Sequence, residues 1–347
     1  MVYFDYVDNL QAFLSLIFIQ IEGYIFTYVS GFKLQDGVEA FRVLRLLSYP
    51  GFLFREIGNS RYSTTTWSPL LIGFMVQLTV HVIAFLITIL FYRERKIHFF
   101  LKQICTYGYY SIAPHGIVMM ATLLNGQNKY ILAMLCLIQS LFMRPFHIYL
   151  HFYHTEQERK LGNIDDEESN HEEEDKGDDE KFNGGNDTFG WEMFHAIFST
   201  QNVGFLFGML WAGTKWEFPK FIETISSYAE NAISCATLFF LGVIFHYHPI
   251  KGCKYLKVIT YLLIHFILIP FIAVLYCWAF HIDKSTARII VVLFSLPIDN
   301  VGLEILNFDD PKSIKLNSTT YTIYFSQIIG FPLMMCWLAF INNVSIF

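Results

Sequence analysis

Ionisable side chains stand beside a proline in two otherwise apolar segments of this sequence. In the first, SIAPHGIVMM, His115 follows Pro114. In the second, SLPIDNVGLE, Asp299 and Glu304 follow Pro297. Proline removes a backbone hydrogen bond from a helix interior at a cost of about 3 kcal/mol, and the freed backbone groups cannot face lipid tails. Because histidine changes charge near neutral pH, such groups beside free peptide groups could bind a charged solute or a proton.

The two prolines occupy roughly equivalent places in the two halves of the chain. They lie 183 positions apart, and the first apolar segments of the two halves, which begin near Asn9 and Gly190, have nearly the same offset. This is a weak internal repeat. Paired, interrupted spans at matching positions of two halves are typical of the binding site of a secondary transporter.

The composition places the chain in a bilayer. With 54% hydrophobic residues, 18% aromatic residues and a mean hydropathy of +0.40, the chain cannot hide its apolar surface in one soluble core. Apolar runs near 20 residues, long enough to cross about 30 Å of hydrocarbon, recur along its length. They predict an all-α polytopic membrane protein with ten transmembrane helices, at about 9–30, 36–57, 68–92, 100–124, 129–153, 190–213, 217–246, 255–280, 285–307 and 318–342.

An acidic segment divides the chain into three parts. Between Thr155 and Thr188 stand 14 Asp or Glu residues against four Lys or Arg residues, with few apolar side chains. Such a segment cannot offset the entropy of ordering itself. We therefore expect a five-span repeat at 1–154, a disordered linker at 155–189 and a second five-span repeat at 190–347. A spacer role is favoured, and a regulatory or partner-binding role stays open.

The positions of lysine and arginine predict the orientation. One set of loops carries seven of these residues, whereas the set that includes the acidic linker carries fourteen. By the positive-inside rule, the linker lies in the cytosol and both termini lie outside or in a lumen, in a plasma membrane or endoplasmic reticulum membrane. Arg144, just before Pro145, is interpreted as a long side chain that extends to the cytosolic interface.

Three stretches of the second half carry a resemblance to a known family. Asn202 opens NVGFLFGMLW, the motif Phe240-Leu241-Gly242 closes FPKFIETISSYAENAISCATLFFLG, and Leu296-Pro297 lies in ARIIVVLFSLPIDNVGLEIL. In their order and spacing these stretches resemble the carboxyl-terminal half of the auxin efflux carrier family. The first half fits more loosely, so that the resemblance covers roughly two thirds of the chain.

The resemblance implies two inverted five-helix repeats whose broken fourth and ninth helices cross at their prolines. It also implies that a small organic anion, either an auxin-like carboxylate or a dicarboxylate, is held at that crossing and moved by alternating access. Carried over by position, the candidate substrate-binding residues are Pro114, His115, Gly116, Asn202, Pro297, Asp299, Asn300 and Gly302. We add the hypothesis that His115, Asp299 and Glu304 couple transport to protons.

The chain departs from the family at two of these positions. His115 stands where plant-type carriers have an uncharged asparagine, and Val203 stands where a proline often follows the asparagine of the sixth span. Auxin itself is therefore not the expected substrate. Capping roles remain open for His115 and Asp299, since either side chain could bond a backbone group freed by the break. Asn202 joins helices or faces the substrate path.

Other classes of protein are less well supported by the residues. His147, His151 and His154 share one helix face and could hold a metal. The other histidines form no second triplet of that kind, so we expect no enzyme, metal or cofactor. A passive channel or a membrane receptor or scaffold is the alternative to a transporter. The expected partners are the bilayer and the anion, with protons and a homodimer left open and no nucleic acid.

Overall fold

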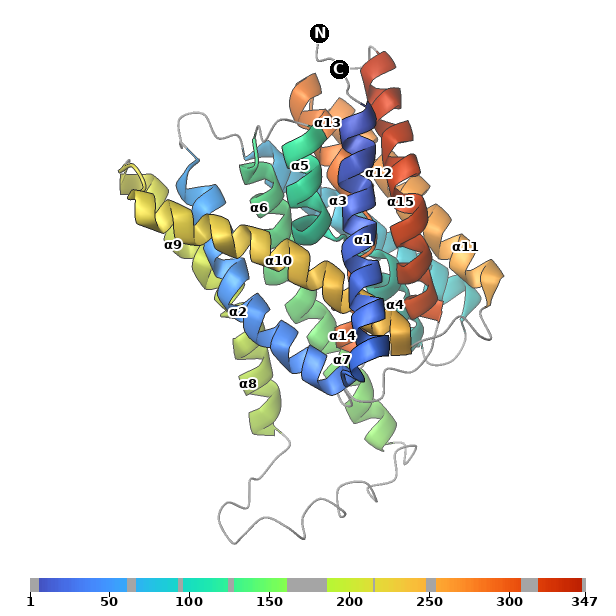
Figure 1. Cartoon of the computed structure of the whole chain (residues 1–347). Helices are drawn as coiled ribbons and strands as arrows, with labels where there is room; N and C mark the ends of the chain where they lie inside the picture. Colours follow the sequence, from blue (N-terminus) through green and yellow to red (C-terminus); the bar gives the residue numbers. More distant parts are fainter. Residues whose placement is uncertain are drawn as a thin grey trace, which may run out of the picture.

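The computed structural model describes the chain except residues 1–5, 61–66, 93–95, 124–127, 161–185, 215, 248–253, 307–317 and 345–347. The described residues form helices, which confirms the all-α class for this part of the chain (Figure 1). The helices of the first half are α1 Tyr6–Ser30, α2 Leu34–Gly58, α3 Ser68–Phe91, α4 Lys96–Tyr107, η1 Ile112–Gly116, α5 Ile117–Leu123, α6 Tyr130–Leu137, η2 Ile138–Met143 and α7 Arg144–Lys160. Those of the second half are α8 Asn186–Ile197, α9 Thr200–Thr214, α10 Lys220–Tyr247, α11 Tyr255–Leu263, η5 Ile264–Leu268, α12 Ile269–Ala279, α13 Lys284–Phe294, α14 Val301–Leu306 and α15 Ser318–Asn343. The elements η1, η2 and η5 are π-helical turns.

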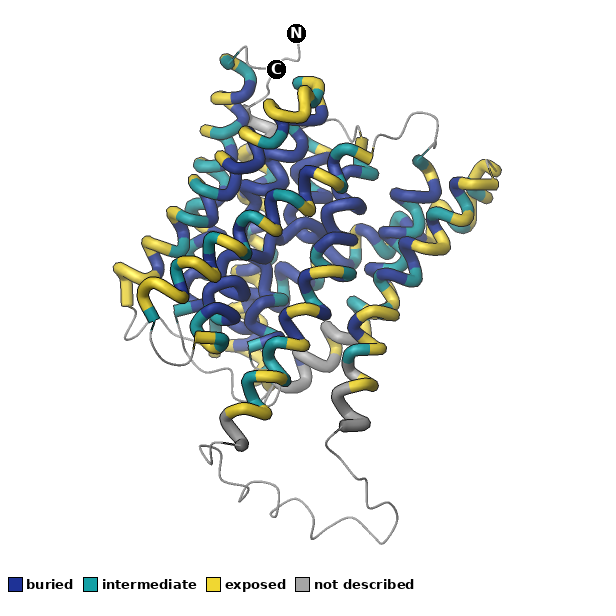
Figure 2. The backbone as a smooth tube through the Cα atoms, turned by 180° about the vertical axis from the view of Figure 1, so that it is seen from behind, coloured by how far each residue is buried: buried dark blue, intermediate teal, exposed yellow. Residues whose placement is uncertain are grey.

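Six continuous helical stretches among the described residues are long and apolar enough to cross a membrane. They are α1, α3, α6 to α7, α10, α11 to α12, and α15. The other four predicted spans coincide with α2, which carries more charge, and with the interrupted helices α4 to α5, α8 to α9 and α13 to α14. Large apolar side chains are exposed on the outward faces (Figure 2), as in Phe18, Leu90 and Leu210. A surface of this kind suits lipid and not water.

The helices form two groups. In the four-helix bundle, α2 packs on α9 and α10, and α10 packs on α1 (Figure 1). Its helices approach closely, because a Cβ added at Gly23 would lie 2.0 Å from the Phe239 carbonyl oxygen, and one at Gly242 would lie 1.9 Å from the Gln20 carbonyl oxygen. Helices α3 to α7 and α11 to α15 form the broken-helix bundle, in which α14 packs on α4 and α12 packs on α3 and α13, and α8 packs on α7.

Two helices of the broken-helix bundle are interrupted near the predicted places. Between α4 and η1 the backbone of residues 108–111 is not helical, and Pro114 lies in the first turn of the helix that follows. Proline is tolerated there because that turn has no intrahelical partner for its nitrogen. Between α13 and α14 the interruption covers residues 295–300 and includes Pro297.

The ends of the described helices lie on two opposite faces. The start of α1 and the end of α15 lie at one face, and the end of α7 and the start of α8 lie at the other (Figure 1). Helix α7 extends to Lys160 and α8 begins at Asn186, so the helices reach beyond the predicted repeat boundaries at 154 and 190. Most of the expected linker, residues 161–185, lies outside the described residues.

Candidate functional site

The two helix interruptions are hydrogen-bonded to one another. The Ser111 amide donates to the Pro297 carbonyl oxygen at 2.8 Å, and the Asp299 amide donates to the Tyr109 carbonyl oxygen at 3.1 Å. Tyr110 and Ile298 between them form an antiparallel bridge. Backbone groups that the breaks release from the helices thus satisfy each other in the protein interior, which removes the cost of leaving them unpaired.

Polar side chains from neighbouring helices bind the second interruption. The Ile298 amide donates to Ser326 Oγ at 3.1 Å, and Gln327 Nε2 donates to the Ile298 carbonyl oxygen at 3.1 Å. Gln20 Nε2 of α1 donates in turn to Gln327 Oε1 at 3.3 Å. These contacts connect the interruption to α15 and, through α15, to the four-helix bundle.

His265 of η5 joins the helix ends on both sides. Its Nδ1 lies 2.8 Å from the Tyr107 carbonyl oxygen, and its Nε2 lies 2.7 Å from the Leu296 carbonyl oxygen. Because a carbonyl oxygen only accepts, each bond requires a hydrogen on the ring nitrogen that makes it, and a neutral ring carries one such hydrogen. The ring stacks on Tyr110, and both helix ends contribute partial negative charge.

The candidate residues of the first interruption lie in η1. Pro114, His115 and Gly116 are buried there, and His115 Nδ1 lies 2.7 Å from the hydroxyl of Ser111, one turn earlier. His115 therefore stabilises the first turn of the helix that begins at Ile112. It makes no hydrogen bond or ion pair with Asp299, so the structure does not bring the hypothetical coupling pair together.

The candidate residues of the second interruption, Asp299, Asn300 and Gly302, differ in the contacts that they make. Asp299 is buried, and its Oδ1 accepts from the Asn300 amide at 2.7 Å. Asn300 Nδ2 is buried without a hydrogen-bond partner. Gly302 lies where α14 meets α4, and a Cβ there would be 1.8 Å from the Cys105 carbonyl oxygen. The close approach of α14 to α4 thus requires glycine at position 302.

Two further candidates connect the bundles. Glu304 of α14 accepts from Arg45 Nη1 of α2 with both carboxylate oxygens, at 2.7 and 2.8 Å. Asn202 of α9 accepts from the Ser140 hydroxyl at 2.7 Å and donates to the Ile197 carbonyl oxygen at 2.8 Å. Both side chains therefore have protein partners in this conformation.

A small cavity lies beside the paired interruptions, between the two bundles. Its volume is about 30 Å³, roughly the share of one molecule in liquid water. The lining residues come from α2 and α9, from the two interruptions and the helices that follow them, and from α6, η2 and α7. They are Tyr49, Tyr109, Ala113, Cys136, Gln139, Ser140, Arg144, Gln201, Asp299 and Val301. A cavity with polar side chains in its wall, between two bundles and next to two broken helices, is a candidate solute site.

Comparison with known families agrees with this architecture. A family model described as membrane transport protein matches residues 11–302. The chain belongs to this membrane transport protein family. The resemblance to auxin efflux carriers is thereby confirmed, and the chain is an integral multi-pass membrane transporter. A comparison with curated proteins gives no match.

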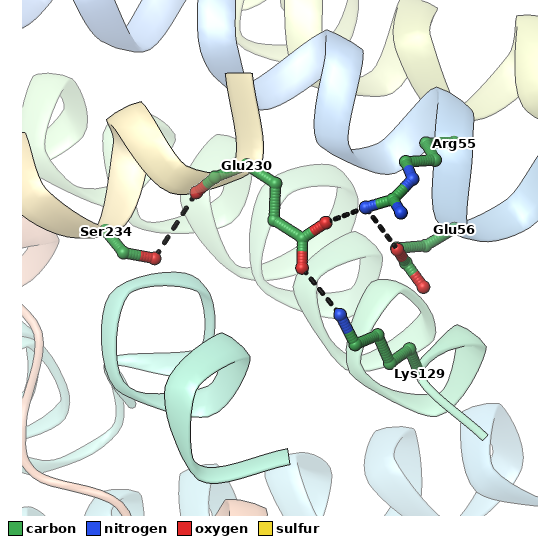
Figure 3. Close-up of polar contacts among 5 residues, drawn as sticks. All are labelled: Arg55, Glu56, Lys129, Glu230 and Ser234. Atoms are coloured by element: carbon green, nitrogen blue, oxygen red, sulfur yellow. Dashed lines mark hydrogen bonds and ion pairs between the residues drawn. The ribbon is translucent and has the colours of Figure 1, made fainter. Parts of the chain in front are cut away.

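In this membrane transport protein a second ion cluster lies at the carboxyl end of α2. Glu230 of α10 accepts from Arg55 Nη1 of α2 and from Lys129 Nζ at 2.8 Å (Figure 3). Glu56 Oε1 lies 3.7 Å from Arg55 Nη1, and the Ser234 hydroxyl donates to the Glu230 carbonyl oxygen at 3.4 Å. Lys129 directly precedes α6, so this cluster, like Arg45 with Glu304, links the two bundles.

His147 and His154, two of the three histidines predicted to share one helix face, contact different partners. His147 Nδ1 lies 2.8 Å from the Tyr109 hydroxyl, and its Nε2 lies 2.9 Å from His81 Nε2. The ring of His154 lies against that of His98. Among the described residues no group of three potential ligands could hold a metal.

Sequence reasoning missed Arg45, Arg144 and His265 as parts of the site. Arg144 was interpreted as an interfacial side chain, whereas it lines the cavity. The available signal was the presence of Arg45 and Arg144 within predicted spans, because intramembrane charges are costly and commonly functional.

Proposed function

We propose that this protein is a secondary transporter of a small organic anion, which works by alternating access and holds the anion beside the paired interruptions. The observation that carries the proposal is the polar cavity next to residues 108–111 and 295–300, whose backbones are hydrogen-bonded to one another. Membership of a transport family supports the general activity, and the substrate class and mechanism are inferred.

The two ion clusters support alternating access. Arg45 and Arg55 are ten residues apart on α2, about 15 Å along a helix, and Tyr49 of the cavity wall lies between them. Arg45 binds Glu304 of the other bundle, and Arg55 binds Glu230, which in turn binds Lys129 of the other bundle. One ion pair between the bundles thus lies on each side of the cavity. A passive channel requires a continuous open path, whereas the cavity in this conformation has room for about one water molecule.

The test is flux into liposomes with Pro114→Ala and Pro297→Ala. Each change allows the neighbouring helix to extend into its interruption and so to separate the paired backbones. We expect saturable uptake of a carboxylate by the natural protein and at least a tenfold lower rate in both variants, as about 1.4 kcal/mol would give.

Pro332→Ala is the matched control, because Pro332 lies inside the uninterrupted helix α15. Its rate should stay within about twofold of the natural protein, a difference of less than about 0.5 kcal/mol. Flux that does not saturate and ignores both interruption prolines would favour a channel.

A further inference from the structure

Arg144 presents an unpaired positive charge to the cavity. It is the first residue of α7 and lines the cavity together with Asp299. No hydrogen bond or ion pair is formed by its guanidinium within the described structure, whereas Arg45 is bound to Glu304. An arginine in a protein interior is expected to have an anionic partner. Arg144 is attracted only at longer range by Glu304, which Arg45 already binds, so the cavity has one cation with no anion in direct contact.

A second hydrogen-bond donor at the cavity also lacks an acceptor. Gln139 Nε2 is buried without a hydrogen-bond partner, and Gln139 also lines the cavity. Gln139 and Arg144 stand at the two ends of η2, a π-helical turn of the type often found at functional sites. A buried donor left unpaired costs about 1 to 3 kcal/mol. An acceptor group placed between the two side chains would satisfy both.

The other source of positive charge at the site is already occupied. A helix N-terminus attracts anions, and α14 begins beside the cavity. Asn300 directly precedes α14, and its amide already donates to Asp299 Oδ1. The anion therefore has Arg144 as its charged partner, and Asp299 places a carboxyl group in the wall of the same cavity.

We propose that Arg144 binds the carboxylate of the substrate, that Gln139 donates a further hydrogen bond to it, and that Asp299 restricts the substrate to a single negative charge. This inference rests on the proposed function as an anion transporter. A carboxylate accepts two parallel hydrogen bonds from a guanidinium. A second carboxylate on the same molecule would lie close to Asp299 in an interior where like charges repel strongly. The substrate class is thus a monocarboxylate and not a dicarboxylate.

The test measures initial uptake of benzoate, hexanoate and succinate into proteoliposomes over a range of concentrations. For Arg144→Gln we expect the KM for benzoate or hexanoate to rise by about 10- to 100-fold, since a hydrogen bond to a charged group contributes about 1.5 to 3 kcal/mol. Arg144→Lys keeps the charge without the forked geometry and should give an intermediate KM. Asp299→Asn should increase succinate uptake relative to benzoate.

Arg288→Gln is the matched control, because Arg288 is a partly buried arginine in α13 that does not line the cavity. Its KM should be unchanged. Thermal unfolding with benzoate gives a second measurement, in which benzoate should raise the Tm of the natural protein and not that of Arg144→Gln. This readout and the lysine variant apply even if Arg144→Gln gives too little folded protein for uptake.

The results separate the inference from the function on which it rests. If the natural protein takes up none of the carboxylates, the proposed function fails. If it takes up benzoate or hexanoate and Arg144→Gln has the same KM, only the role of Arg144 is overturned. If succinate is preferred to both monocarboxylates by the natural protein, the restriction to one charge is overturned.

Discussion

Glu230→Gln should open the cavity towards the face on which Lys129 lies. In the natural protein Glu230 accepts from Arg55 of its own bundle and from Lys129 of the other. Of these two contacts of Glu230, only the one with Lys129 crosses between the bundles. Neutral glutamine keeps the shape of the side chain and removes the charge attraction, so the conformation in which the bundles separate at this end becomes more populated.

The size of this shift follows from the burial of the pair. The side chains of Lys129 and Glu230 are 22% and 5% exposed. Exposed pairs contribute about 1 kcal/mol or less, whereas removal of one partner from a buried pair costs about 3 to 5 kcal/mol. An intermediate value of about 2 kcal/mol corresponds to a roughly 30-fold rise in the open population, at 1.4 kcal/mol for each factor of ten.

Cys136 supplies the assay. It is a buried free cysteine that lines the cavity, and the other five cysteines can be replaced by serine or alanine. The labelling rate of Cys136 by a membrane-impermeant maleimide, added from the Lys129 side of proteoliposomes, reports how often the cavity opens to that side. We expect labelling to be about 30 times faster in Glu230→Gln, as the estimate above requires.

Glu56→Gln is the control for this experiment. Glu56 lies in the same cluster but stands on α2, and its ion pair is with Arg55 of its own bundle, so its loss removes only a longer-range attraction to Lys129 and no direct ion pair between the bundles. Its labelling rate should be nearly that of the natural protein. The reasoning is refuted if Glu230→Gln labels no faster than the natural protein, or if both variants accelerate labelling equally. Glu304→Gln should accelerate labelling from the opposite face by the same argument.

Two further substitutions test the packing and the hydrogen bonds of the interior. Gly242→Ala places a methyl group 1.9 Å from the Gln20 carbonyl oxygen and should lower the free energy of unfolding by about 1 to 3 kcal/mol, whereas Gly190→Ala, with no atom within 4 Å, should not. His265→Gln keeps a donor for one of its two carbonyl partners and His265→Phe keeps none, so thermal unfolding should rank the natural protein above the first variant and the first above the second. Equal Tm values for the two His265 variants would contradict the role given to the ring.

The interruptions were predictable from sequence because proline has one dominant effect on a helix. The prediction placed the first break at Pro114, whereas the backbone leaves the helix at Gly108 and resumes it at Ile112. Proline occurs in the first turn of a helix as well as in the non-helical segment between two helices. The position of a proline in the sequence therefore does not show which of these places it occupies. At the second break Pro297 lies inside the gap itself, and the expected place was correct.

The partners of the charged residues were not predictable in this way. Arg45 and Glu304 are 259 positions apart, and their pairing depends on how α14 packs against α2. Arg144 stands nine residues before the end of the predicted span 129–153, a position from which a long side chain can reach the interface or the interior. A single sequence gives the depth of a residue in the membrane and not the direction in which its side chain points. His265 is one polar residue in an apolar helix, a pattern that fits many structural roles.

The polar groups that have no hydrogen-bond partner at the cavity indicate the chemistry of the substrate. The backbone groups of the two interruptions largely satisfy each other, His265 binds two of the remaining carbonyl oxygens, and Asp299 binds an amide at the start of α14. Unpaired polar groups are costly away from water, so those that persist at a cavity are expected to bind something else. At this cavity Gln139 Nε2 is buried without a hydrogen-bond partner, and Arg144 forms no hydrogen bond or ion pair among the described residues, so both are free donors. Their chemistry requires an acceptor, and the charge of Arg144 requires that acceptor to be an anion.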